Sequence, residues 1–221
     1  QTLEKRLLNS PVTLISKNGD VRTIFNEIYA DLEQLSTAHR LLVRLACFST
    51  FEAPLEALSE DVDDSEVFEA IAEIEELGLV TPRDSDRLAL HALLGLLVKE
   101  QADKKILSEE QYIVGSWLLN HARTNRDDYV LLARDHRNYI GLLDLYHRKN
   151  QYRETISLTH ALYDYFRVQG HWQEAKRRLE NAMSAAKVLN IKEDQAWIGL
   201  AYGEILILRG EYDQARKELD E

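Results

Sequence analysis

The residue types that carry out chemistry occur in this 221-residue sequence without the spacing that catalysis needs. The one cysteine, Cys47, lies between Leu45 and Phe48 in an apolar helical pattern, which favours a small buried side chain over a nucleophile. Paired carboxylates such as Glu69 and Glu73 act as acid and base only in a pocket that shifts their pKa, and the sequence indicates none. A nucleophile elbow of the G-x-S-x-G type is absent. We therefore expect that this chain is not an enzyme.

Cofactor sites are not indicated either. The sequence contains no G-x-x-x-x-G-K-[ST] loop, whose backbone amides would cradle nucleotide phosphates, and no apolar strand that ends in acidic residues. Helical zinc sites use histidine pairs one turn apart, at i and i+4. Five histidines lack such a partner, namely His121, His136, His147, His160 and His171. We expect the chain to bind no metal and no ATP.

The charge distribution argues against nucleic acid as a partner. The formal net charge is -11, and residues 1–127 hold 13 Lys and Arg against 23 Asp and Glu, while residues 128–221 hold 14 against 15. Affinity for a phosphate backbone depends on clustered basic residues, so nucleic acid is an unlikely partner. The one dense basic cluster is expected to be solvated or paired with Glu174 and Glu180, and it consists of Lys176, Arg177 and Arg178.

Composition favours a mainly α protein. The whole chain contains only 3 prolines and 9 glycines, which are too few turn-forming residues for the many short connections of a β-sandwich or barrel. One cysteine excludes internal disulfides, and no apolar run approaches the ~20 residues that cross a bilayer. We expect a cytoplasmic protein without a membrane segment. Because the chain begins at Gln1 and ends at Glu221 inside a helical pattern, we interpret it as a fragment of a longer protein.

Residues 36–100 show the element order of a winged-helix domain. Three helices are expected, the first capped by Ser36 or Thr37, the second with Pro54 in its first turn and running through Leu58, and the third from about Ser65 to Gly78. Two strands follow, joined by a turn at 82–86, and they cover residues 79–80 and 87–91. An irregular helical bundle with a surface loop remains the alternative.

The region from 101 to 221 is predicted to be helical throughout. A helix from Ser108 to Arg123, with Ser108 as its cap, is expected within the linker region 101–127. Amphipathic helices with short connections follow, over about 129–148, 151–168, 171–189, 193–208 and 211–221. Tryptophans at helical core positions are expected to pack, and these are Trp117, Trp172 and Trp197.

A repeated motif gives the most specific signal. The segment Gly170-His171-Trp172-x-x-Ala175 is matched forty residues later by Gly210-Glu211-Tyr212-x-x-Ala215, and Asn150-Gln151-Tyr152 begins a weaker copy. Glycine, an aromatic residue and a small residue at this spacing form the turn and second-helix start of a tetratricopeptide unit. Residues 128–221 are therefore predicted to form such repeats. Coincidental helical hairpins remain the alternative.

Three segments together resemble one family. The helix Leu41-Leu42-Val43-Arg44-Leu45-Ala46-Cys47-Phe48 resembles the "LL..LAVF" helix of STAND proteins, the signal-transducing ATPases with numerous domains that include the NB-ARC group. Leu90-His91-Ala92-Leu93-Leu94 resembles their "MHD" or "LHPLL" segment, and 135–175 resembles their repeat arm. The likeness covers roughly residues 22–221 in the family's order.

The resemblance implies a domain plan and one site residue. It implies that 1–35 ends a preceding helical domain, 36–100 is a winged helix, 101–127 are linker helices, and 128–221 is a truncated repeat arm. A nucleotide-binding domain would precede them, and the parent protein would be an ATPase that binds ATP and ADP. The family's matching histidine contacts the nucleotide phosphate and holds the ADP state closed, which implies this role for His91. Here Leu90 and Ala92 replace the motif's methionine and aspartate, and a structural histidine at a strand-to-helix junction remains the alternative.

Two functions therefore remain in view. The first is a regulatory and interaction region, in which the winged helix couples nucleotide state to a repeat arm that binds a protein partner or ligand. The second is a DNA-binding transcriptional regulator with a winged helix and a helical dimerisation tail. The third helix disfavours DNA, because nine acids and no Lys or Arg occur between Glu60 and Glu76. This acidic face is expected to be solvated, or else to dock a basic partner domain.

Overall fold

The computed structural model describes residues 20–32 and 36–220, and it is mainly α-helical. Residues 1–19, part of the segment 1–35 that the resemblance implies as the end of a helical domain, lie outside the described residues. The chain divides into two compact units, Gln1–Trp117 and Leu118–Glu221. No helix among the described residues is both long and apolar enough to span a bilayer.

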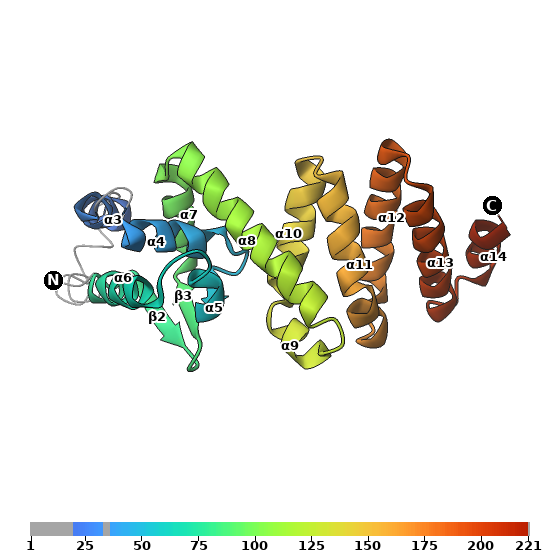
Figure 1. Cartoon of the computed structure of the whole chain (residues 1–221), viewed down its shortest axis with the longest axis horizontal. Helices are drawn as coiled ribbons and strands as arrows, with labels where there is room; N and C mark the ends of the chain where they lie inside the picture. Colours follow the sequence, from blue (N-terminus) through green and yellow to red (C-terminus); the bar gives the residue numbers. More distant parts are fainter. Residues whose placement is uncertain (1–19, 33–35, 221) are drawn as a thin grey trace. The chain divides into compact units, whose positions relative to one another are not determined.

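The first unit combines short helices with a small sheet (Figure 1). Its elements, in order, are α3 (Asp20–Asp31), α4 (Thr37–Cys47), β1 (Glu52–Pro54), α5 (Leu55–Leu58), α6 (Asp64–Glu76), β2 (Val80–Arg83), β3 (Arg87–Leu90), α7 (Ala92–Gln101) and most of α8 (Lys104–Thr124). The Ser36 hydroxyl caps α4 by accepting a bond from the His39 amide, and Gly78, at φ 71°, follows α6. Both residues act as the sequence predicts.

The sheet has three strands in the order β1-β3-β2, all antiparallel, where the sequence predicted two. The additional strand β1 pairs Glu52 with Ala89, and the Leu90 amide donates to the Phe51 carbonyl at 2.8 Å. Three residues ending in proline carry too little periodicity to indicate a strand. Strand β2 runs to Arg83, past the expected end at Val80. Pro82 can be part of this strand because β2 lies at the edge of the sheet, where a residue without a backbone N–H is tolerated.

The core of the first unit forms around α4. Leu42, Leu45 and Phe48 have no measurable exposure, and α4 packs against α6, α7 and the sheet. One side chain of α4 is both charged and buried: Arg44 donates from Nε to Glu110 Oε2 at 2.7 Å and from Nη1 to the Leu58 carbonyl at 2.9 Å. Both charged side chains are enclosed, so this pair joins α4 to α8 inside the core.

Helix α8 begins earlier than expected. The sequence analysis placed its cap at Ser108, but the helix starts at Lys104 and its first amides are bonded by Asp103, whose Oδ1 accepts from the Lys105 amide at 2.8 Å. Glu110 therefore lies in the helix interior rather than in its first turn.

The second unit is a succession of helices that stand side by side in chain order from α10 to α14 (Figure 1). Its elements are α9 (Tyr129–Arg134), α10 (His136–Arg148), α11 (Tyr152–Val168), α12 (Trp172–Leu189), α13 (Lys192–Leu208) and α14 (Tyr212–Asp220). The expected helix at 129–148 is interrupted at Asp135, whose amide bonds the carbonyl of Leu132.

Left-handed turn residues separate the last helices where the sequence predicted breaks. These are Asn150, Gly170, Asn190 and Gly210, with φ between 55° and 76°. The small residues of the repeated motif are buried: Ala175 is 1% and Ala215 2% exposed. The motif's aromatic residues differ, since Trp172 is half-buried and donates to the Arg167 carbonyl, while Tyr212 is 67% exposed.

The basic cluster on α12 is paired rather than solvated. Arg178 is 1% exposed, and its guanidinium bonds Asp144 of α10 and Glu174 one turn earlier, both at 2.5 Å. Lys176 pairs with Glu211 at 2.6 Å and Arg177 with Asp144 at 2.6 Å. Of the two expected alternatives, solvation or pairing, the structure shows pairing, with Glu174 for Arg178 but with Asp144 and Glu211 in place of Glu180, which accepts from the Tyr202 hydroxyl.

Candidate functional site

His91 caps a helix and is exposed to solvent. It is the N-cap of α7, and its Nδ1 accepts a hydrogen bond from the Leu93 amide at 3.3 Å. Leu88 and Leu90 before it in the chain are buried, whereas Leu93 after it is 44% exposed. The imidazole is accessible at the strand-to-helix junction, and its hydrogen bond is this local cap.

The outer face of α6 is acidic. Val67, Ile71 and Ile74 are buried on its inner face. The opposite face exposes four carboxylates, those of Glu66, Glu69, Glu73 and Glu76. The sequence pattern did not single out Phe68, which is 67% exposed on the same helix. The paired carboxylates Glu69 and Glu73 therefore lie in solvent, without the enclosing pocket that acid–base chemistry requires.

Cys47 is only half-buried, which corrects the expectation of a core position. Lys99 on α7 is also largely covered, its Nζ lying 4.8 Å from the Phe51 ring centroid. Burial lowers the pKa of Lys99, and the electrostatic influence of Cys47 opposes that change. The Phe51 ring packs directly against Gly95 of α7. A Cβ at position 95 would lie 2.3 Å from the phenyl ring, so a side chain there would overlap with it.

Histidines of the second unit form contacts with aromatic residues rather than a metal site. The His136 and His171 rings lie 4.6 Å apart, and His136 Nδ1 is 3.0 Å from the Tyr165 hydroxyl. Burial lowers the pKa of His136, and the neighbouring His171 lowers it further. Among the described residues, no group of three or more His, Cys, Asp or Glu side chains is arranged to hold a metal ion.

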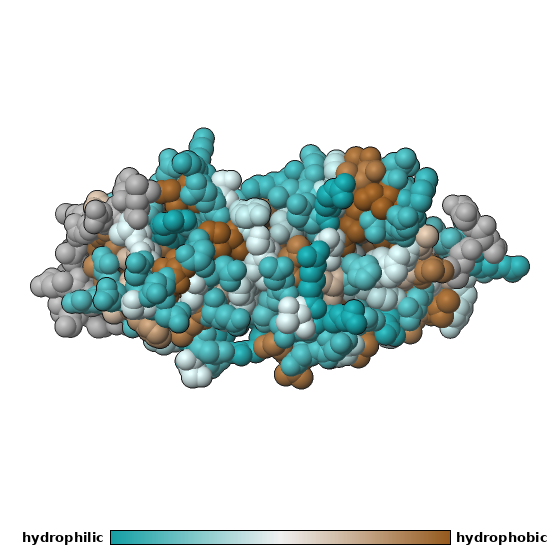
Figure 2. Space-filling model, in the orientation of Figure 1, coloured by the Kyte–Doolittle hydropathy of each residue, from teal (hydrophilic) through white to brown (hydrophobic). Residues whose placement is uncertain are grey.

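The surface offers little apolar area for a partner on the face that Figure 2 displays. That face is mainly hydrophilic, with apolar residues in small separated groups. Such groups are ordinary on soluble proteins and do not by themselves mark an interface.

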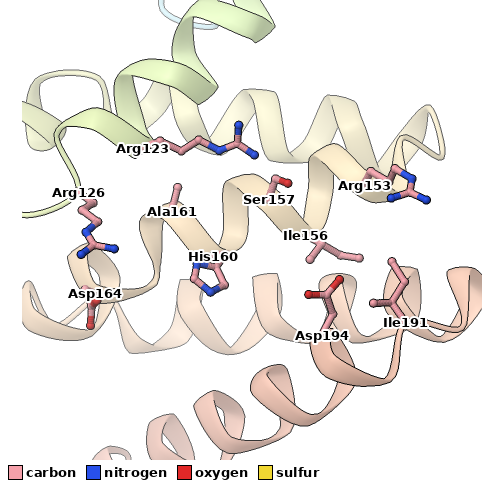
Figure 3. Close-up of a pocket in the computed structure, with 10 residues that line it drawn as sticks. All are labelled: Arg123, Arg126, Arg153, Ile156, Ser157, His160, Ala161, Asp164, Ile191 and Asp194. Atoms are coloured by element: carbon pink, nitrogen blue, oxygen red, sulfur yellow. The ribbon is translucent and has the colours of Figure 1, made fainter.

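A cleft of about 350 Å³ lies within the second unit (Figure 3). This volume is within the usual range of ligand sites, roughly 300–1,000 Å³. Helix α11 supplies one wall through residues three or four positions apart, which share a face. The lining residues are Arg123, Arg126, Arg153, Ile156, Ser157, His160, Ala161, Asp164, Ile191 and Asp194. His91 is not among them.

The helices on both sides of the cleft are tied together. Tyr163 on α11 donates its hydroxyl to Glu204 Oε2 on α13 at 2.5 Å, and Arg167 Nη1 lies 3.4 Å from Glu204 Oε1. Burial and the bond to Glu204 raise the pKa of Tyr163, so the phenol remains a proton donor at neutral pH. The Trp197 indole of α13 stacks on the His160 imidazole of α11, with centroids 4.1 Å apart. The cleft therefore has a fixed wall.

The sequence analysis did not bring the cleft arginines together. Arg123 belongs to the end of α8, Arg126 to the following loop and Arg153 to α11, so their proximity depends on how the helices pack. One signal was present: Arg153, Ser157, His160 and Asp164 recur at helical spacing. That spacing marks a polar helix face but cannot show that another basic segment lies opposite.

Comparisons with protein-family models, with curated proteins and with solved structures find no match to this chain. Function must therefore be inferred from its own residues. The geometry provides an exposed histidine at a helix start in the first unit and an arginine-lined cleft in the second.

Proposed function

We propose that the chain is the regulatory and protein-interaction region of a STAND-type signalling ATPase. In this proposal, residues 36–100 are a winged helix, 128–221 are tetratricopeptide-like repeats, and a nucleotide-binding domain belongs to the same cytoplasmic protein. The winged helix couples the nucleotide state to a partner bound on the repeats. The chain itself contributes no catalytic residue.

The element order of the first unit carries the proposal. Helices α4, α5 and α6 precede the hairpin of β2 and β3, and β1 between the first two helices completes the sheet. The hairpin projects beyond the helices of this unit in Figure 1, as a wing does. This arrangement supports a winged helix over an irregular bundle with a surface loop. A surface loop would not need to pair in register with two other segments, as the three strands of this sheet do.

The second unit supplies separate support. The two strong copies of the repeated motif begin with a left-handed glycine and bury their alanines, Ala175 and Ala215. A small residue there allows close helix approach, which is the physical role of that position in helical repeats. Stacked helix pairs present an extended surface that suits recognition of a protein partner.

His91 would connect the two states of such a switch. Its exposed imidazole lies at the start of α7, where a phosphate from an adjoining nucleotide-binding domain would meet both a ring nitrogen and helix amides. A bond made only in the ADP state would favour that closed conformation by its own binding free energy. Partner binding to the repeats would favour the open conformation.

DNA binding is the weaker function for this fold. The helix that would enter the major groove is α6, and its exposed face carries Glu66, Glu69, Glu73 and Glu76. Carboxylates repel the phosphate backbone and provide none of the usual guanine or adenine contacts of Arg, Lys, Asn and Gln.

The reading frame upstream of Gln1 tests the family proposal. A G-x-x-x-x-G-K-[ST] loop is expected there, and a frame without one contradicts the proposal. In the longer protein, His91→Ala is expected to speed release of fluorescent ADP by roughly tenfold, equivalent to one lost phosphate contact. The control His147→Ala changes an exposed histidine of the second unit and should leave the rate unchanged. Equal rates for wild type and His91→Ala would remove the sensor role.

A further inference from the structure

We infer that the cleft between α11 and α13 binds an acidic peptide segment of a protein partner. The inference rests on the proposed interaction role of the repeats and assigns the chemistry of their partner. It follows from three properties of the cleft: its exposed arginines, its mixed hydrogen-bonding groups and its fixed aromatic wall.

Among the described residues, the cleft arginines lack the carboxylate partners that enclose two buried arginines of the chain. Arg44 and Arg178 are enclosed and bonded by carboxylates and carbonyls. Within the described part of the chain, by contrast, no carboxylate reaches ion-pair distance of Arg123 or Arg153. Arg126 approaches only its exposed neighbour Asp127, at 3.6 Å. Guanidinium groups form bidentate bonds with carboxylates, so these three side chains provide anion sites that the fold leaves open.

The arrangement of charge suits a short peptide. Figure 3 shows Arg126 and Asp164 at one end of the cleft and Arg153 and Asp194 at the other, with His160 between them. Arginines at both ends can bind acidic side chains. Asp194, and the Oδ2 of Asp164, whose Oδ1 already accepts from Arg167 at 3.0 Å, can accept backbone N–H groups of the same segment. An extended peptide needs both kinds of partner, because its own amides and carbonyls are unpaired.

A nucleic acid fits this cleft less well. Asp164 and Asp194 would face its phosphates directly, and the whole chain carries a formal charge of -11. Polyanion binding needs a continuous basic surface with few interrupting acids. An acidic peptide brings fewer negative charges and also hydrogen-bond donors that pair with the aspartates.

The cleft wall is organised before a ligand arrives. His160 stacks on Trp197, which in turn meets the Tyr163 ring edge-on at 5.5 Å between centroids. Tyr163 is fixed by its bond to Glu204. Ile156 and Ala161 contribute apolar surface to the cleft lining. A small peptide side chain between two acidic residues can cover this surface. A preorganised wall reduces the entropy lost on binding.

Fluorescence anisotropy of the 221-residue chain tests the inference. The probe is a short fluorescein-labelled peptide in which Glu alternates with Ala, and the matched probe replaces every Glu with Gln. We expect the Glu peptide to bind, the affinity to fall as NaCl rises, and the Gln peptide not to bind. Single-stranded DNA of equal charge is the third probe and is expected to bind more weakly than the Glu peptide.

Charge-reversal variants locate the binding. The double variant Arg123→Glu with Arg153→Glu is expected to raise Kd for the Glu peptide by roughly 30-fold or more, from the loss of two charge-assisted contacts. Both side chains are exposed, so the fold should persist, which circular dichroism checks. The control Arg148→Glu reverses one charge, half the change of the double variant, at an exposed position outside the cleft, and should alter Kd by less than about twofold.

Three outcomes would overturn the inference: no binding of the Glu peptide, tighter binding of DNA, or equal losses in the cleft and control variants. The family proposal fails separately, since it depends on the loop upstream of Gln1. Whether or not the Glu peptide binds, the measurement does not test for the presence of that loop.

Discussion

Arg44 and Glu110 form an ion pair with both side chains at most 1% exposed, joined at 2.7 Å across 66 residues of sequence. Glu110 also bonds Arg40, and Arg44 also bonds Asp61 at 2.8 Å. Because the guanidinium and carboxylate are enclosed, neither can exchange its partner for water. The pair holds α8 in one register against α4.

We therefore predict that Glu110→Ala lowers the free energy of unfolding by about 3–5 kcal/mol, because it leaves Arg44 charged and without its main partner in the core. The measurement is urea unfolding followed by circular dichroism, with hydrogen exchange to localise the loss to α4 and α8. The neighbouring Glu109→Ala is the control: Glu109 is 48% exposed and lies 3.9 Å from Lys105. It should change stability by less than about 1 kcal/mol. Equal losses in the two variants would contradict a structural role for the buried pair.

A pair of glycine substitutions tests the packing of Phe51. Gly95 of α7 faces the phenyl ring, and an added Cβ would lie 2.3 Å from Phe51 Cδ1, whereas a Cβ at Gly199 of α13 would only reach Met183 Cε at 3.9 Å. We expect Gly95→Ala to destabilise the chain by about 1–3 kcal/mol through overpacking. Gly199→Ala should be neutral or stabilise it by up to about 1 kcal/mol, since alanine favours a helix.

Thermal unfolding of the two glycine variants measures this difference. Combining Gly95→Ala with Phe51→Leu should restore part of the loss, because the smaller side chain removes the overlap. If Gly95→Ala is as stable as Gly199→Ala, the close approach of Phe51 to α7 is not a constraint on the fold.

The helices were predictable from the sequence because their signals are local. Apolar spacing and left-handed breaks at Gly170 and Gly210 located α11 to α14 to within about two residues. Features that depend on distant partners were missed. The strand β1 needs β3 to pair with, and Glu110 is buried only because Arg44 lies opposite. The arginine cleft has the same origin, as three segments contribute its charge.

Titration of His136 makes the second unit sensitive to acid. Burial and the adjacent His171 lower the pKa of His136 below its ordinary value of 6.5, while Glu174 opposes this and Arg137 and Arg178 reinforce it. The unfolded chain therefore binds more protons than the folded chain just below pH 6.5. Stability is full above that pH and falls as the pH decreases toward the folded pKa.

We expect His136→Gln to weaken this acid dependence of the urea midpoint, compared with wild type between about pH 7.5 and pH 5.5. The amide keeps a group that can bond the Tyr165 hydroxyl but does not titrate. His147→Gln is the control, at an exposed position on the same helix. Wild type and His136→Gln losing stability in parallel would show that His136 does not contribute.

The last prediction separates a sensor from a structural residue at His91. The imidazole is exposed and makes one cap bond at 3.3 Å to the Leu93 amide. Removing a cap of this kind costs at most about 1 kcal/mol, so His91→Ala should lower the stability of the chain only slightly. His91→Asn should restore that stability, because asparagine is a favourable N-cap. Its side chain is shorter than that of histidine, so it should not restore the contact to phosphate. In the longer protein proposed above, both variants should speed ADP release, since neither replaces the contact to phosphate. If His91→Ala instead costs more than about 2 kcal/mol in this chain, a magnitude beyond the cap bond, His91 is primarily structural.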